Sequence, residues 1–209
     1  MLTLLSFYIL PLLGGLISAL VYGVPTLFPA TTLALLMLFI KFQAHEISVD
    51  GLTGLNNRRQ FDMNLQTMIA DVHRQGHLML LLTDIDSFKN INDTYGHLEG
   101  DHALIETAKT LKRICRGRDV FLCRYGGDEF AIICNFHDAS EAYTLKQDII
   151  EAFKERNESN QVPYSIVMSI GIKEFSPDHG DSIKALLSGA DKELYKDKAL
   201  HKNNVNRLF

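Results

Sequence analysis

The segment Gly126-Gly127-Asp128-Glu129 places two glycines next to two carboxylates. Apolar runs at 120–123 and 131–134 flank this segment, and each run is typical of a buried strand. Because glycine tolerates a positive φ angle, the two glycines predict a tight two-residue turn between the strands. Both carboxylates would then lie beside a turn without side chains, where phosphates and a divalent metal ion can approach the backbone. An ordinary hairpin with solvated acids is the alternative.

A second pair of carboxylates follows another apolar run. Residues 78–83 carry no charge and predict a central strand, and Asp84 and Asp86 come directly after them. Aspartate is unfavourable inside strands, so its place at the mouth of this one indicates a function. Since Mg²⁺ prefers carboxylate oxygens together with substrate phosphates, Asp84 and Asp128 would clamp one or two such ions if the hairpin lies beside this strand. For Asp86, capping of a short helix at 87–93 is the alternative.

Polar residues continue beyond these acids. Lys89 could offset negative charge that develops on a phosphate in a transition state, although a single lysine is also typical of a solvated surface. Residues 90–101 are rich in turn formers and hydrogen-bonding side chains, which predicts a loop between two helices. Such a loop also suits recognition of a flat polar ring, because a carboxylate can accept hydrogen bonds from guanine N1–H and its 2-amino group.

The elements that would position these residues follow from hydrophobic periodicity. Helical patterns cover 58–74, 101–115, 139–157 and 181–200. Strand patterns lie at 78–83, on both sides of the glycine pair, at 164–172, and as a short edge strand at 204–209. This order predicts an α+β fold, in which a mixed central sheet has flanking helices. About 160 residues are enough for one hydrophobic core.

The amino-terminal part has a different composition. Residues 1–40 contain no Asp, Glu, Lys or Arg. One bilayer crossing needs about 20 residues, so this length predicts a transmembrane helical hairpin with crossings at 2–21 and 26–42. We therefore expect two transmembrane helices over 1–42, a short helical linker over 43–50, and one folded domain over 51–209. The alternatives are a secretory signal, which would need a basic start and a shorter apolar stretch, and one crossing plus a surface segment.

Charge and cysteine content restrict the partners and the compartment. The formal net charge is −4, which does not indicate nucleic acid as a partner. Lys41, Arg58 and Arg59 follow the second apolar segment, so the positive-inside rule predicts that the folded domain is cytoplasmic. The three cysteines lack metal-ligand spacing and are expected to be reduced, buried thiols.

The chain resembles GGDEF-domain diguanylate cyclases from Asp50 to about Asn204. Several motifs carry the resemblance, and their order makes it specific. They are Asp50-Gly51-Leu52-Thr53-Gly54-Leu55-Asn56-Asn57-Arg58-Arg59, Asp84-Ile85-Asp86-Ser87-Phe88-Lys89, Asn92-Asp93-Thr94-Tyr95-Gly96-His97, Gly100-Asp101, Arg124-Tyr125-Gly126-Gly127-Asp128-Glu129-Phe130, Ser169-Ile170-Gly171, and Ala190-Asp191 with Leu194-Tyr195-Lys196-Asp197-Lys198.

The resemblance implies a palm-like nucleotidyl-cyclase fold and a signalling enzyme. Such a transferase condenses two GTP molecules into cyclic di-GMP and releases two pyrophosphates. Each subunit of a homodimer brings one GTP. Mg²⁺ or Mn²⁺ would be bound by the carboxylates of Asp84 and Asp128 and by the backbone carbonyl of Ile85. Lys89 would stabilise the transition state, and Asp128 or Glu129 would help to deprotonate the attacking 3′-hydroxyl.

The remaining implied roles concern the nucleotide. Binding of the substrate would involve Asn92 and Asp101 at the guanine, His97 in the substrate site, Gly126 and Gly127 near the α-phosphate, and Lys198 and Lys202 at the terminal phosphates. Relatives that accept adenine tend to lack an acid at the position of Asp101, so its presence favours GTP. Two departures from the family lie close together. Lys202 replaces a usual arginine and loses its bidentate geometry, and His201 replaces a usual glycine.

The family often carries an inhibitory product site, Arg-x-x-Asp, five residues before the glycine pair. Here Arg116 and Asp119 supply the two side chains, but six residues, 120–125, separate them from Gly126. The extra residue would either be absorbed as a β-bulge, leaving the site intact, or rotate Arg116 away. A basic loop after a helix is the alternative without binding.

We therefore expect a diguanylate cyclase anchored to the lipid bilayer and inhibited by its product. A catalytically inactive GGDEF domain that acts as a GTP or cyclic di-GMP receptor is the main alternative, and a membrane scaffold that recruits partners is a third. The retained acids and Lys89 favour the enzyme, because an inactive domain does not need the full set.

Overall fold

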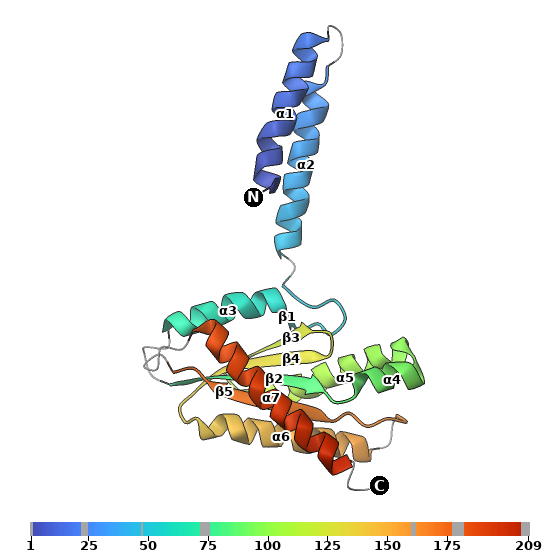
Figure 1. Ribbon diagram of the computed structural model, residues 1–209, viewed down its shortest axis with the longest axis vertical. Coiled ribbons are helices and arrows are strands. Elements are labelled where there is room, and N and C mark those ends of the chain that lie inside the picture. Colours follow the sequence, from blue (N-terminus) through green and yellow to red (C-terminus); the bar gives the residue numbers. More distant parts are fainter. Residues whose placement is uncertain are drawn as a thin grey trace. The chain divides into compact units, whose positions relative to one another are not determined.

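The computed structural model describes residues 2–21, 25–46, 48–71, 76–159, 162–176 and 182–205. The chain divides into two compact units, Met1–Ser48 and Val49–Phe209. Figure 1 shows a helical hairpin in the first unit and a sheet with helices on both faces in the second. The division falls within the segment predicted as a linker at 43–50.

The first unit consists of α1 (Leu2–Leu20) and α2 (Leu27–Glu46). Thr26 connects them, because its Oγ1 donates to the Gly14 carbonyl at 2.7 Å and its backbone N–H donates to Ser18 Oγ at 2.9 Å. A Cβ atom at Gly14 would lie 2.6 Å from Cβ of Ala30. Glycine at this position therefore permits the close approach of the two helices.

The two predicted membrane crossings have no support in the described part of the chain, where no helix has the length and apolar character needed to cross a bilayer. Helices nevertheless occupy both segments. Pro11 lies inside α1, and α2 continues into the polar residues His45 and Glu46. Residues 22–24, which would join the two predicted crossings, lie outside the described residues.

The described residues of the second unit form five strands: β1 (Asn56–Asn57), β2 (His77–Ile85), β3 (Val120–Gly126), β4 (Glu129–Phe136) and β5 (Met168–Glu174). Their order in the sheet is β1-β3-β4-β2-β5. β1 is parallel to β3, and the other neighbours are antiparallel, which confirms the predicted mixed sheet. β2 is an interior strand of the sheet, between β4 and the edge strand β5.

Helices cover the sheet on both faces. The alternation of side chains along β2 explains this, because Leu78, Leu80 and Leu82 pack with α3 (Arg58–Asp71) and α7 (Ile183–Val205). Met79 and Leu81 of the same strand pack on the opposite face with α5 (His97–Cys115) and α6 (Ser140–Glu158). The fold is therefore a three-layer α+β sandwich.

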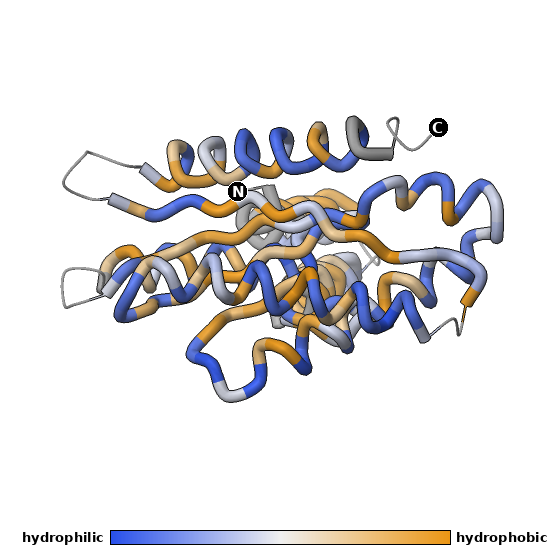
Figure 2. The backbone as a smooth tube through the Cα atoms, turned by 90° about the horizontal axis from the view of Figure 1, so that it is seen from below, coloured by the Kyte–Doolittle hydropathy of each residue, from blue (hydrophilic) through white to orange (hydrophobic). Residues whose placement is uncertain are grey.

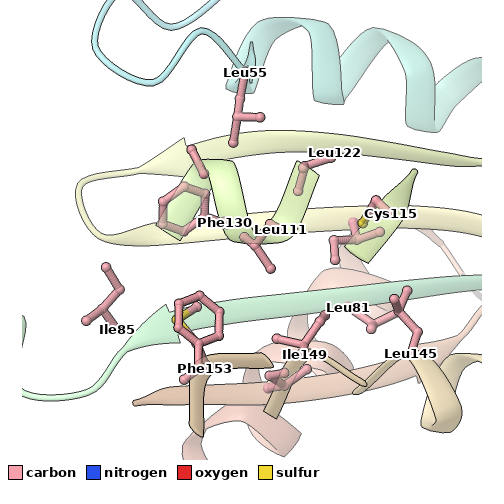
Figure 3. Packing of buried hydrophobic residues seen from close by; sticks show 14 of the residues in the cluster. Leu55, Leu81, Ile85, Leu111, Cys115, Leu122, Phe130, Leu145, Ile149 and Phe153 are labelled. Atoms are coloured by element: carbon pink, nitrogen blue, oxygen red, sulfur yellow. The ribbon is translucent and has the colours of Figure 1, made fainter. Parts of the chain in front are cut away.

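Figure 3 shows the core on the α5 and α6 side, where Leu111 and Cys115 of α5 lie near Leu122. On the other face, hydrophobic and hydrophilic residues alternate along α7 in Figure 2, as expected for a helix with one buried side. All three cysteines are free and buried, and their burial agrees with the prediction.

Most predicted elements are confirmed, with shifted ends. The predicted strand at 164–172 begins only at Met168 in β5, and α7 continues through Val205, so the edge strand predicted from residue 204 is wrong there; residues 206–209 lie outside the description. The loop predicted at 90–101 is also wrong. Only Gly96, with φ of 90°, separates α4 (Phe88–Tyr95) from α5. Its positive φ lets one residue end α4 and precede α5, so the polar side chains lie on helices.

Candidate active site

The end of β2 lies beside the turn between β3 and β4. Asp84 is the direct cross-strand partner of Glu129, and the N–H of Ile85 donates to the Asp128 carbonyl at 3.4 Å. The β3–β4 hairpin and the C-terminal end of β2 are therefore adjacent, as the metal-site prediction required. The turn itself is Gly127-Asp128, with φ of 46° at Gly127, whereas Gly126 ends β3. The predicted Gly126-Gly127 turn was therefore misplaced by one residue.

β3 contains a bulge just before this turn. Arg124 pairs with Phe130 and Gly126 pairs with Glu129, so Tyr125 is left without a partner in the ladder. The Tyr125 ring instead packs edge-on against Phe61 at 5.0 Å between centroids. A bulge is thus present in the stretch where the sequence has one extra residue.

The two residues assigned to the product site lie at the ends of the loop between α5 and β3. Arg116 follows α5 and Asp119 precedes β3, and both are exposed. Arg118 between them instead reaches α6, where its Nη2 donates to Asp148 Oδ2 at 2.5 Å. The guanidinium of Arg116 is therefore on the surface, separate from the contact that Arg118 makes.

Asp84 is the most buried acid of the site, with 6 % of its surface exposed. Burial raises its pKa to about 6, and the negative charges of Asp128 and Glu129 act in the same direction, against the lowering effect of Lys198. The Lys198 Nζ lies 2.7 Å from Asp84 Oδ2. The carboxylate is therefore in a place where additional positive charge would be favourable.

The residues available for a metal ion are few. Among the described residues, no group of three or more His, Cys, Asp or Glu side chains is arranged to hold one. At the end of β2 the site offers the carboxylate of Asp84, the nearby negative charge of Asp128, and the backbone of Ile85, whose N–H is hydrogen-bonded to Asp128. This donor set fits Mg²⁺, which typically uses one or two carboxylates and completes its shell with water and substrate phosphates.

Asp86 has partners that sequence reasoning missed. Its Oδ1 accepts a hydrogen bond from Ser169 Oγ at 2.7 Å, and its Oδ2 lies 2.5 Å from His201 Nδ1. The alternative prediction that Asp86 caps the following helix is wrong, because Ser87 is the N-cap residue of α4. Neither partner was identifiable from sequence spacing, since they lie on β5 and α7.

A cleft of about 600 Å³ opens at this place. Asp84 and Asp86 line it from the end of β2, and Lys198, His201 and Lys202 line it from α7. The fold thus brings the predicted residues Asp84, Lys198 and Lys202 together. An opening between acids on one side and cations on the other can hold a metal ion and the phosphates of a nucleotide.

Lys89 and the residues predicted to bind the nucleotide base lie on α4 and α5, and none of them lines this cleft. Lys89 and Asn92 belong to α4, whereas His97 and Asp101 belong to the first turns of α5. Gly100 brings the two helices together, because a Cβ there would collide with Asn92 Oδ1. Lys89, His97 and Asp101 are exposed to solvent.

A family model described as the diguanylate cyclase GGDEF domain matches residues 47–204. The chain belongs to the GGDEF family. It is 39 % identical over 163 residues to the diguanylate cyclase VdcA of Vibrio cholerae, covering 76 % of this chain and 46 % of that protein. It is 32 % identical over 207 residues to YhcK of Bacillus subtilis, covering 96 % of this chain and 54 % of that one. The chain thus spans about half the length of these relatives.

The GGDEF fold is also found among solved structures. The GGDEF domain of DgcB from Caulobacter crescentus, solved in complex with c-di-GMP, superposes with a TM-score of 0.67 at 33 % identity. The superposition covers 74 % of this chain and 91 % of that one. The family assignment agrees with the resemblance inferred from the motifs.

Proposed function

We propose that this GGDEF protein is a diguanylate cyclase that condenses two GTP molecules into cyclic di-GMP. The observation that carries the proposal is the acidic end of β2, where Asp84 pairs across the strands with Glu129, lies near the charge of Asp128, and contacts Lys198. Twice per product, the 3′-oxygen of one GTP attacks the α-phosphorus of the other. A new P–O bond forms, the bond to the β-phosphate oxygen breaks, and pyrophosphate leaves.

Each residue has a defined part in this chemistry. Asp84, Asp128 and the Ile85 carbonyl would hold Mg²⁺, which lowers the charge repulsion between the nucleophile and the phosphates when bound. Glu129 or Asp128 would accept the proton of the 3′-hydroxyl. Gly127 leaves the turn open to the α-phosphate, and Lys198 and Lys202 would bind the departing pyrophosphate. Asn92 and Asp101 would read the guanine, with His97 beside the nucleotide and Lys89 at the developing charge.

The reaction needs a homodimer, because one domain of this kind binds one GTP and the product contains two nucleotides. Two active sites facing one another would place each 3′-hydroxyl at the α-phosphate of the opposite GTP. The rate per subunit should therefore rise with protein concentration until the dimer is fully formed.

Product inhibition through Arg116 and Asp119 is a further part of the proposal. Their exposure and the bulge at Tyr125 support it, since the bulge takes up one residue between Asp119 and the turn. Titration calorimetry with cyclic di-GMP on the wild type and on Arg116→Ala tests it. Equal binding by the two proteins would remove this site.

We also propose that the helical hairpin attaches the protein to the bacterial inner membrane with the GGDEF domain in the cytoplasm. Leu12, Leu20 and Phe28 support attachment, because they are 71 %, 74 % and 75 % exposed and favour an apolar surrounding. Carbonate washing of membranes that contain the full chain tests this proposal. Release into the soluble fraction would contradict it. Labelling of a cysteine placed near residue 24 with a membrane-impermeant thiol reagent would show whether the hairpin crosses the bilayer or enters it from the cytoplasmic side only.

The deciding experiment is incubation of the full chain with GTP and Mg²⁺, with the product identified by chromatography. Cyclic di-GMP is expected from the wild type and none from Asp128→Ala, while Glu155→Ala, which changes an exposed acid of α6, should match the wild type. A folded dimer that binds GTP or cyclic di-GMP without making product would instead be a receptor. Loss of product in Glu155→Ala as well would mean that folding, not chemistry, was affected.

A further inference from the structure

Asp86, Ser169 and His201 form a hydrogen-bonded group that connects three elements. Asp86 follows β2, Ser169 lies fully buried on β5, and His201 lies on α7. A carboxylate only accepts hydrogen bonds, so His201 Nδ1–H donates to Asp86 Oδ2 at 2.5 Å. Ser169 Oγ donates to the other oxygen of Asp86 at 2.7 Å and lies 3.1 Å from His201 Nδ1. Both oxygens of one carboxylate are thus engaged.

Asp86 is itself held in place by the backbone. Its N–H donates to the Val167 carbonyl at 2.9 Å. With the hydrogen bond from Ser169, this fixes the carboxylate to the segment that leads into and along β5. His201 therefore docks α7 onto an acceptor that is already positioned, and the side chains involved are shielded, at 33 % exposure for His201 and 18 % for Asp86.

The geometry of α7 relates this contact to the phosphate cations. Lys198 precedes His201 by three positions, so both side chains lie on one face of the helix. They meet Asp84 and Asp86, which alternate along the end of β2. Lys202 follows His201 directly and lines the same cleft. His201 thus lies between the two lysines.

A separate contact holds α7 further toward its beginning. Asp197 Oδ2 accepts from the Ile170 backbone N–H at 2.8 Å, and its Oδ1 accepts from Lys146 Nζ at 2.9 Å. The helix is therefore attached to β5 at Asp197 and to the end of β2 at His201. Between these attachments, and just after them, the helix carries the cations that face the cleft.

We propose that His201 is a positioning residue of the triphosphate site. By donating to Asp86, it fixes the last turns of α7 so that the ammonium groups of Lys198 and Lys202 stay aligned with the acids at the mouth of β2. This inference rests on the proposed cyclase function for its catalytic readout. It predicts that loss of the Nδ1 donor weakens GTP binding more than it slows turnover, because His201 acts through the lysines and does not contact the reacting atoms.

The test compares His201→Ala, His201→Asn and the control Leu200→Ala, all in the full chain. Leu200 is 60 % exposed on the same helix, so its truncation should be silent. Asparagine offers an N–H donor close to the position of histidine Nδ1. We expect His201→Ala to raise the KM for GTP about tenfold, since the lost hydrogen bond is to a charged group, with less than threefold change in kcat. His201→Asn should recover most of the affinity.

Two measurements test the role of His201 independently of the cyclase activity. Binding of a non-hydrolysable GTP analogue by calorimetry needs no turnover, and amide hydrogen exchange at 196–202 reports the order of α7 without any ligand. Faster exchange in His201→Ala and recovery in His201→Asn are expected.

Unchanged KM, analogue affinity and exchange in His201→Ala would overturn the proposal, and so would an asparagine variant as impaired as the alanine variant. If the wild type makes no product, the cyclase function fails, and the analogue and exchange data still decide the role of His201. Faster exchange without a change in analogue affinity would show that His201 supports the helix alone and would also overturn the proposal.

Discussion

Gly171 of β5 controls how closely α7 approaches the sheet. A Cβ atom at this position would collide with the Ala190 carbonyl oxygen and the Leu194 backbone nitrogen, and would lie 2.8 Å from Leu194 Cα. All three are backbone atoms of α7, so no side chain can rotate away to make room. Replacement of Gly171 by alanine must therefore shift the helix by on the order of 1 Å.

The size of the effect follows from this displacement. Forcing one extra methyl group into a closely packed interface costs about 1–3 kcal/mol, and the upper part of this range applies because rigid backbone is displaced. For a unit of this size, 2–3 kcal/mol corresponds to a fall in melting temperature of roughly 4–12 °C. The shift also moves Lys198 relative to Asp84, so we expect at least about a tenfold loss of kcat/KM.

Gly51→Ala provides a matched control. Gly51 has no heavy atom within 4 Å of an added Cβ, and its φ is not positive, so the same chemical change should alter stability by less than about 0.5 kcal/mol. Urea unfolding followed by circular dichroism gives the free energies, and initial rates with GTP give kcat/KM. A Gly171→Ala protein as stable as Gly51→Ala would show that α7 does not pack on β5 as closely as described.

Three further predictions concern charge and burial. Burial raises the pKa of Asp84 from 3.8 to about 6, so ionisation of Asp84 lowers the stability of the folded state as pH rises from about 4 to 6. With metal ions removed by a chelator, Asp84→Asn should therefore be more stable than the wild type by about 1–3 kcal/mol at pH 8. Near pH 3 the two proteins should be equally stable in urea unfolding, because Asp84 is protonated in both states. Burial also raises the pKa of Cys115 to about 11 and of Cys123 to about 12, so the folded protein should not react with a thiol reagent at pH 8, whereas all three cysteines should react in urea. Lys146→Met removes the ion-pair partner of Asp197 and should lower the free energy of unfolding by about 1–3 kcal/mol. As a control, Lys154→Met breaks an exposed pair with Glu151 and should change the free energy of unfolding by less than about 0.5 kcal/mol. Equal effects of the two substitutions would contradict the role given to Lys146.

The central part of the site could be predicted because local pattern and chemistry agreed there. An uninterrupted apolar run predicted β2 as a strand covered on both faces, and Asp84 at its end conflicted with strand preference unless it had a function. The glycine pair then predicted a hairpin, whose acids would act together with Asp84 if the hairpin lay beside this strand. These inferences need only the period of a strand and the conformational freedom of glycine, both of which are properties of short segments.

Other parts depend on contacts between distant residues. β1 is two asparagines, and only its pairing with Cys123 and Arg124 makes it a strand. The segment at 90–101 has loop-like composition, but Gly96 alone separates two helices, because Ile91, Ala103 and Leu104 gain burial in the core. Arg124 meets Asp50 at 3.1 Å across 74 positions of sequence, and no local pattern indicates that pair.

The contact between His201 and Asp86 belongs to this second kind, and it explains why the mouth of β2 needs α7. Asp84 and Asp86 alternate at a strand end and lie on one side, and the buried Asp84 also lies beside the negative charges of Asp128 and Glu129, so a facing cation favours its ionised form. Positions three apart on a helix give matching spacing, and Lys198 and His201 occupy such positions. A helix that slid by one residue along β5 would lose both pairs together. The register of α7 against the sheet is therefore fixed by close packing at Gly171, by hydrogen bonds at Asp197 and His201, and by an ion pair at Lys198. The same register determines where Lys198 and Lys202 lie in the cleft.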